Sequence, residues 1–220
     1  MPKNSGTKRG RPPKGIAGDT QARILDAAQQ LFIEKGYRST SIDEISENAP
    51  ASKPTIYAHF AGKDALFAAV VARTISELTD WEGFTPEGRA IQDKLASLGT
   101  AIVERAIAEL LGILRATIAE APQFPDLSRS VHEAARDRSA RSMSQLLNDA
   151  TSEIAPSAKG PFSAKRNLAT AQIFLDLIVI PMLFRSLLGD TPKNLKKELP
   201  AFMRERVSFF LAACEVDWQY

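Results

Sequence analysis

Apolar residues recur every three or four positions along most of the chain, which is the period of an amphipathic α-helix. The first such stripe consists of Ile24, Ala27, Ala28, Leu31 and Phe32. We expect this helix to begin at Asp19 or Thr20 and to end near Gly36, because glycine is favoured directly after a helix. The pattern continues to the C-terminus with breaks at segments rich in Gly and Pro. It predicts an all-α protein of about nine helices.

Residues 40–63 read as two short helices joined by a tight turn. Ser41 followed by Glu44 forms a capping box, which satisfies free N–H groups at a helix start. That helix should stop before Pro50, because the residue preceding a proline is pushed out of the α region. Ser52 is a suitable N-cap for the second helix, and Pro54 fits its first turn, where no N–H is needed.

The second short helix has little to pack. Ile56 and Phe60 look like core residues, and the other faces carry hydrogen-bonding side chains: Lys53, Thr55, Tyr57 and His59. A short helix that presents donors outward suits the major groove of DNA. Tyr57 and His59 could instead be core aromatics. The spacing from Ile56 and Phe60 argues against that for His59, whereas we expect Tyr57 both to pack and to reach outward.

In this region the chain resembles the TetR family of bacterial transcriptional regulators, over about residues 19–78. The resemblance is carried at fixed spacings by Thr40, Ile45, Ala49, Ser52, Thr55, Tyr57, His59, Phe60, Lys63 and Leu66. It implies an N-terminal three-helix helix-turn-helix domain, at residues 19–80, that binds DNA. The chain departs from the family at Pro50, where the turn usually has a glycine. Glycine adopts positive φ and proline does not, so we expect the turn to differ locally.

The resemblance also assigns the DNA contacts. It implies that Lys53, Pro54 and Thr55 meet base edges. It implies that phosphates are met by Thr40, Ser41, Tyr57, His59 and Lys63. The implied molecule is a homodimer on a palindromic double-stranded operator, more often a repressor than an activator, released by a small-molecule inducer.

Residues 1–18 lack apolar periodicity, and we expect a disordered basic arm. Residues 1–63 contain ten Lys or Arg and six Asp or Glu, a net charge of +4, whereas residues 64–220 carry −2. The basic end of the chain is therefore the end expected to face DNA. The run from Lys8 to Lys14 resembles an AT-hook, in which Arg9 and Arg11 would enter a narrow minor groove. The alternative is a solvated tail that only adds solubility.

Residues 81–220 are expected to form a second, helical domain for ligand binding and dimerisation, and residues 115–127 resemble the AefR-like subset of TetR C-terminal domains. Small alanines that face large aliphatic residues make a cavity between helices plausible. Its expected lining is Trp81, Phe84, Leu98, Ile102, Arg115, Ile118, Phe124 and Phe174. The ligand should be mainly apolar, oriented by Arg115, Thr117 or Asp176. The alternative is a filled core, which would fit an architectural protein that binds AT-rich DNA without an inducer.

The last two predicted helices, at about residues 164–188 and 195–214, carry more apolar surface than one protomer can cover. In the TetR family this pair forms a four-helix bundle with its twin. The expected interface consists of Phe174, Ile178, Met182, Phe202, Val207 and Phe210. The alternative is an ordinary buried core in a monomer.

Other classes of function find little support in the sequence. His59 and His132 are its two histidines and Cys214 its one cysteine, so we expect no metal site, cofactor, disulfide or catalytic triad. The longest apolar run, residues 173–184, is too short for a membrane span and contains Asp176 and Pro181. We therefore expect a cytoplasmic protein that is neither an enzyme nor bound to a membrane.

Overall fold

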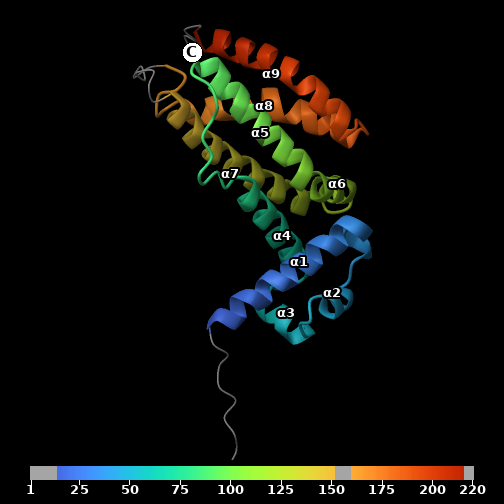
Figure 1. Ribbon diagram of the computed structural model, residues 1–220. Coiled ribbons are helices and arrows are strands. Elements are labelled where there is room, and N and C mark those ends of the chain that lie inside the picture. The colour runs from blue at the N-terminus through green and yellow to red at the C-terminus, as the bar shows by residue number, and fades with distance from the viewer. Residues whose placement is uncertain (1–13, 152–159, 216–220) are drawn as a thin grey trace, which may run out of the picture. The chain divides into compact units, whose positions relative to one another are not determined.

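A computed structural model describes residues 14–151 and 160–215. In this part of the chain the regular secondary structure is nine helices (Figure 1), which confirms the all-α prediction. Their bounds are α1 Lys14–Ser39, α2 Ile42–Asn48, α3 Lys53–His59, α4 Lys63–Leu78, α5 Ile91–Glu109, α6 Leu111–Glu120, α7 Pro125–Thr151, α8 Asn167–Leu187 and α9 Pro192–Glu215. α1 begins ahead of the expected cap at Asp19 or Thr20, and its last turn contains Gly36 at a φ of 81°.

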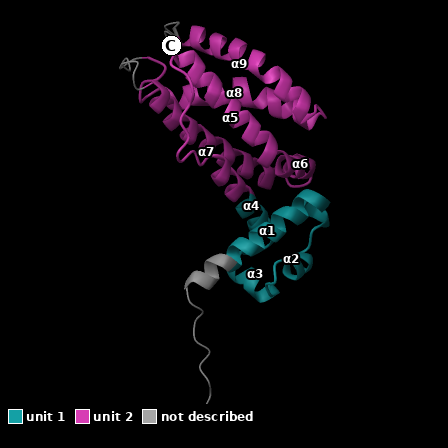
Figure 2. Ribbon diagram, viewed as in Figure 1, with its two compact units in different colours: residues 1–70 teal, residues 71–220 magenta. Residues whose placement is uncertain are grey.

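Two compact units divide the chain (Figure 2), at residues 1–70 and 71–220. The first unit contains α1 to α3 and the start of α4, and the second contains the end of α4 and α5 to α9. The boundary falls inside α4, earlier than the boundary after residue 80 that the sequence suggested. α4 is thus one continuous helix to which both units contribute residues.

The core of the first unit is an aromatic cluster. The rings of Phe32 and Tyr37 each meet the ring of Phe67 edge-on, with centroids 5.1 Å apart in both pairs. Ile45 of α2 and Ile56 of α3 are fully buried. Burial of each such side chain contributes roughly 1.5–3 kcal/mol, so α2 and α3 are held mainly by this core and little by their own length.

In the second unit α8 packs against α5, α7 and α9. Gly99 of α5 permits the close approach of these helices. A Cβ atom at Gly99 would lie 2.9 Å from Met203 Sδ and 3.3 Å from Ile178 Cγ2. Phe174 of α8 and Phe210 of α9 meet edge-on in this core, with ring centroids 5.1 Å apart.

The composition of α8 suits either a membrane span or the core of a helical protein. With a mean hydropathy of 1.7 it is long and apolar enough to cross a membrane, and it is the one such helix among the described residues. However, 44% of the apolar window is buried inside the helical unit. A core helix of a soluble protein passes the same test of length and composition.

Candidate nucleic-acid interface and ligand cavity

The start of α2 is fixed by the predicted capping box. Ser41 Oγ accepts from the backbone N–H of Glu44 at 3.2 Å, and Glu44 Oε2 accepts from the backbone N–H of Ser41 at 3.0 Å. Lys35 of α1 donates to the other oxygen of Glu44 at 2.8 Å. The Lys35 ammonium, and secondly the Ser41 backbone N–H, lower the pKa of the Glu44 carboxyl. The carboxylate therefore remains charged in the position that caps α2.

The start of α3 also follows the prediction. Ser52 Oγ accepts from the backbone N–H of Thr55 at 3.3 Å and lies 2.7 Å from Thr55 Oγ1. Pro54 occupies the first turn of the helix. These local interactions and the burial of Ile56 determine which faces of α3 point outward.

The turn between α2 and α3 contains the departure from the family pattern. Pro50 has a φ of 26°, on the positive side of the Ramachandran map. A pyrrolidine ring favours a φ near −65°, so the backbone at this residue is strained. The turn thus keeps the sign of φ that a glycine would supply, in contrast to the local change of turn that we expected from the sequence.

The outward face of α3 presents the residues that the sequence singled out. Lys53, Pro54 and His59 are exposed, and Tyr57 is 55% exposed. Tyr57 thus points outward, as expected, while the rest of its side-chain surface is covered. Thr55 is half-buried because its hydroxyl contacts Ser52. This arrangement offers donors to base edges and phosphates from one short helix.

Lys53 has an ionic partner that the sequence reasoning missed. Its Nζ lies 2.6 Å from Asp43 Oδ1 of α2, and both side chains are largely exposed. Exposed pairs of this kind contribute about 0–1 kcal/mol to stability, so a stronger anion can replace the carboxylate. Asp43 and Lys53 are ten positions apart in sequence, and only the packing of α2 on α3 brings them together.

Two of the expected phosphate contacts are used inside the protein. Thr40 is 1% exposed, and its hydroxyl donates to the carbonyl oxygen of Gly36 at 2.8 Å. Lys63 Nζ donates to the carbonyl oxygens of Tyr37 and Thr40, each at 3.0 Å, and lies 4.4 Å from the centroid of the Tyr37 ring. Both side chains hold the end of α1, where carbonyl groups lack helical partners. Ser41 is exposed. Arg9 and Arg11 lie outside the described residues.

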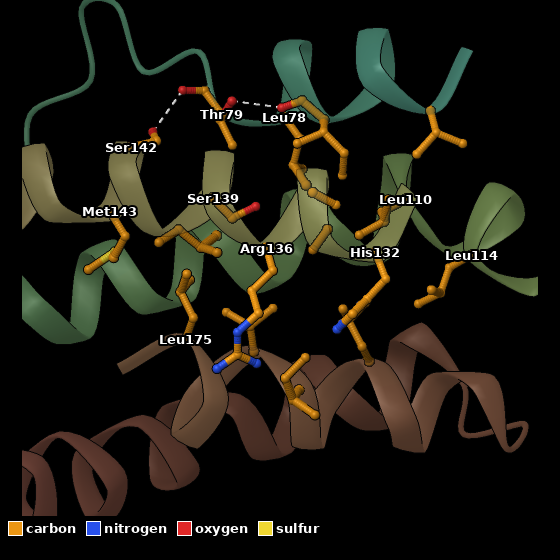
Figure 3. Close-up of a pocket in the computed structure, with 18 of the residues that line it drawn as sticks. Leu78, Thr79, Leu110, Leu114, His132, Arg136, Ser139, Ser142, Met143 and Leu175 are labelled. Carbon is orange, nitrogen blue, oxygen red and sulfur yellow. Dashed lines mark hydrogen bonds between the residues drawn. The ribbon is translucent and has the colours of Figure 1, made fainter. Parts of the chain in front are cut away.

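A cavity of about 210 Å³ lies inside the second unit. Its walls come from the end of α4 and from α5, α6, α7 and α8, and most of the side chains that line it are aliphatic. Figure 3 shows Leu78, Leu110, Leu114, Met143 and Leu175 around it. This apolar lining supports the expected cavity and is typical of a site for a small apolar molecule.

The predicted lining of the cavity needs correction. Trp81 and Ile102 line it, and the six other residues that we named do not: Phe84, Leu98, Arg115, Ile118, Phe124 and Phe174. Leu98 and Phe174 are fully buried core residues. Arg115 Nη2 donates to the carbonyl oxygen of Ser186 at 3.1 Å, and Ile118 is 52% exposed. Of the residues proposed to orient a ligand, Thr117 and Asp176 line the cavity.

The largest group of lining residues that the sequence reasoning missed comes from α7. Its side chains His132, Arg136 and Ser139 line the cavity (Figure 3) at positions i, i+4 and i+7, one face of a helix. Arg136 Nη2 lies 3.2 Å from Asp176 Oδ2 of α8. The i, i+4, i+7 spacing of these three residues was the signal in the sequence that could have identified them.

The expected dimer interface also needs correction. Five of its six residues, Phe174, Ile178, Met182, Val207 and Phe210, are buried within a single protomer, and Phe202 is half-exposed. The apolar residues that α8 exposes are others: Leu168, Ile173, Ile180 and Phe184. Phe209 is exposed on α9.

Within residues 14–151 and 160–215 no group of three or more His, Cys, Asp or Glu side chains could hold a metal ion. Cys214 is half-buried near the end of α9.

Models of known families match both units. The model described as bacterial regulatory proteins of the tetR family matches residues 24–70. The model described as the C-terminal domain of AefR-like transcriptional repressors matches residues 93–215. The second match covers more than half of the chain.

Similar proteins extend over nearly the full length. The HTH-type transcriptional regulator YvkB of Bacillus subtilis (strain 168) is 31% identical over 179 residues, which are 81% of this chain and 89% of YvkB. A crystal structure of a protein described as a TetR-family transcriptional regulator from Mesorhizobium loti MAFF303099 matches with a TM-score of 0.71 and 28% identity, over 90% of this chain and 97% of that one. The flavonoid-responsive regulator FrrA matches with a TM-score of 0.66 and 25% identity, over 92% of this chain and 100% of FrrA. The chain therefore belongs to the TetR family of transcriptional regulators, and its first unit carries the helix-turn-helix DNA-binding domain of that family.

Proposed function

We propose that this protein is a cytoplasmic repressor that binds a palindromic operator as a homodimer and is released by a mainly apolar small molecule. The contacts to DNA come from Lys53, Pro54, Thr55, Tyr57 and His59 of α3, with Ser41 and the arm residues Arg9 and Arg11. Thr40 and Lys63 are left out of these contacts, since their side chains bind the end of α1. Repression is supported by the match to the AefR-like transcriptional repressor domain.

The apolar stripe on α8 carries the dimer proposal. Ile173, Ile180 and Phe184 follow one another at i, i+7 and i+11, so they lie on one face of the helix. They are 59%, 53% and 60% exposed, whereas isolated protomers rarely expose a continuous row of large apolar side chains. A second copy of the same stripe covers it with two-fold symmetry. The resulting dimer places its two α3 helices on the two half-sites of the operator.

Release by a ligand is supported by the cavity and by α4. Val71, Ile75 and Leu78 of α4 line the cavity, and the same helix begins at Lys63 in the DNA-binding unit. A ligand that shifts the end of α4 therefore acts on the helix that leads to α3. The cavity also argues against the architectural alternative, for which a filled core was expected.

The experiment is to substitute the stripe and measure mass and operator binding together. Phe184→Glu buries an unpaired charge if α8 is the interface, so light scattering should show a monomer, and binding to a selected palindrome should fall by at least about 100-fold. Ile33→Glu is the matched control, because Ile33 is an exposed apolar residue of α1 and the dimer should persist. A dimer of unchanged affinity for the Phe184→Glu protein would contradict the proposed interface.

A further inference from the structure

The cavity of the second unit carries no net charge. Among the described residues that line it, Arg136 and Asp176 are the charged ones, and they pair with each other at 3.2 Å. A ligand with a net charge must either break this pair or enter without a counter-ion. The two side chains are 47% and 50% exposed, so opening the pair costs little, and a charged ligand is disfavoured mainly because most of the cavity lining is aliphatic.

The same cavity contains polar side chains that lack partners. Within the part of the chain that the structure describes, His132, Ser139 and Gln172 form no side-chain hydrogen bond to another residue. Thr79 and Ser142 differ, because the Thr79 hydroxyl donates to Ile75 O at 2.7 Å and the Ser142 hydroxyl donates to Thr79 O at 2.9 Å. Ser139 and Gln172 are half-buried and His132 is exposed, so a pure hydrocarbon would remove water mainly from Ser139 and Gln172, which costs free energy.

His132 and Ser139 lie seven residues apart on the cavity side of α7, and Figure 3 shows both side chains at the cavity. Seven residues correspond to roughly 10 Å along a helix axis. The two polar groups thus stand at separate places, and Ala135 and the Arg136 of the neutral Arg136–Asp176 pair lie between them.

We propose that the cavity binds an uncharged, mainly apolar molecule with a hydroxyl or carbonyl oxygen at each end of a rigid apolar body. One oxygen bonds Ser139, and the other bonds His132 or Gln172. The inference rests on the proposed function in taking this cavity as the ligand site, and it adds the chemical class of the ligand. The Arg136–Asp176 pair remains intact, and the mainly aliphatic lining disfavours ions of either sign.

The test uses four probes of one shape: biphenyl, biphenyl-4,4′-diol, biphenyl-4,4′-dicarboxylate and 4,4′-bis(aminomethyl)biphenyl. Binding to the full-length protein is measured by calorimetry at pH 7. The diol should bind at least about tenfold more tightly than each of the others, as expected for two hydrogen bonds without a charge. Tightest binding by the dicarboxylate or the diamine, or no binding by the diol, would overturn the proposal.

Variants locate the interaction. Ser139→Ala should weaken binding of the diol by about five- to tenfold and leave binding of biphenyl unchanged, because it removes one hydrogen-bonding group. Gln172→Leu should have the same effect if Gln172 holds the second oxygen and no effect if His132 does. Ser130→Ala is the matched control on α7, since the Ser130 hydroxyl donates to Leu127 O outside the cavity. Ala135→Leu, which fills part of the cavity, should weaken binding of the diol and of biphenyl to the same extent. A diol affinity that is the same in all four variants would contradict the assignment.

The affinity of the protein for the operator is measured separately, with each probe bound. If the diol binds with this variant profile but leaves operator affinity unchanged, the ligand class stands and the proposed regulation fails. If a charged probe binds in the cavity and releases the operator, the proposed regulation stands and the ligand class fails.

Discussion

Pro50 is the residue at which local chemistry and the required turn disagree. Its φ of 26° is one that glycine reaches without strain and that a proline ring resists. Pro50→Gly should therefore raise the free energy of unfolding by about 1–3 kcal/mol, the range of a relieved backbone strain. Urea denaturation followed by circular dichroism measures this change.

Pro54 provides the control within the same motif. It occupies the first turn of α3, where the proline ring suits the helix, so Pro54→Gly should lower stability by roughly 1 kcal/mol. Opposite signs for the two substitutions are the expected result. If both variants are destabilised alike, Pro50 is not strained in the folded protein.

Asp43 competes with DNA for Lys53. The ion pair at 2.6 Å must open before the ammonium group reaches a base edge, and the carboxylate repels phosphate. Asp43→Asn should therefore tighten operator binding by about three- to tenfold, whereas Lys53→Ala should weaken it by about 1–3 kcal/mol and relax preference at one base pair per half-site. Fluorescence anisotropy over a range of salt measures both effects.

Glu47→Gln is the control for Asp43→Asn, because Glu47 is also an exposed acid of α2 and the change in charge is the same. It should alter affinity by less than the Asp43 variant does. Equal gains from the two variants would show that net charge alone, and not the contact to Lys53, limits binding.

The short helices were predictable because their determinants are local. Ser41 with Glu44 and Ser52 with Thr55 are capping pairs three residues apart, and sequence spacing alone identifies them. The inward hydrogen bonds of Thr40 and Lys63 could not be predicted from sequence spacing. Their side chains meet the end of α1, and which polar group points inward depends on how α1, α2 and α4 pack.

The faces of α8 were not predictable from periodicity. The helix is apolar on nearly all sides, so no stripe distinguishes the core-facing Phe174 from the exposed Ile173 and Phe184. The register of α5, α7 and α9 against α8 decides this. The lining of the cavity was not predictable from periodicity either, because the end of α4 and the helices α5 to α8 supply it together.

The two faces of α8 can be separated experimentally. Phe174→Ala should lower the free energy of unfolding by about 3–5 kcal/mol, because it leaves a hole beside Phe210 in the core of one protomer. The folded fraction should remain dimeric in sedimentation at low temperature. Phe184→Ala, its counterpart on the exposed stripe, should weaken the dimer and change protomer stability little. A reversal of these two results would place the interface on the side that we assigned to the core.

At the scale of the molecule, the continuity of α4 joins the ligand site to the DNA-binding unit. If a ligand is to lower the affinity for the operator about 10–100-fold, it must bind the state that does not bind DNA more favourably by about 1.4–2.8 kcal/mol. The coupling is reciprocal, so operator DNA must lower the affinity for the ligand by the same factor. Titration of biphenyl-4,4′-diol with and without saturating operator measures that factor directly.

A glycine substitution that destabilises α4 tests whether this helix couples ligand binding to operator binding. Ala72→Gly changes an exposed position of α4 directly after Val71, the first residue of this helix that lines the cavity, and glycine there weakens the helix by about 1 kcal/mol. The diol and the operator should each bind nearly as before when alone, but the coupling factor should fall toward one. Ala108→Gly on α5 is the control, because it softens an exposed helical position outside α4 and should leave the coupling intact. A diol affinity that is identical with and without operator in the unchanged protein would refute coupling through α4, because a ligand that binds both states equally cannot shift the equilibrium between them.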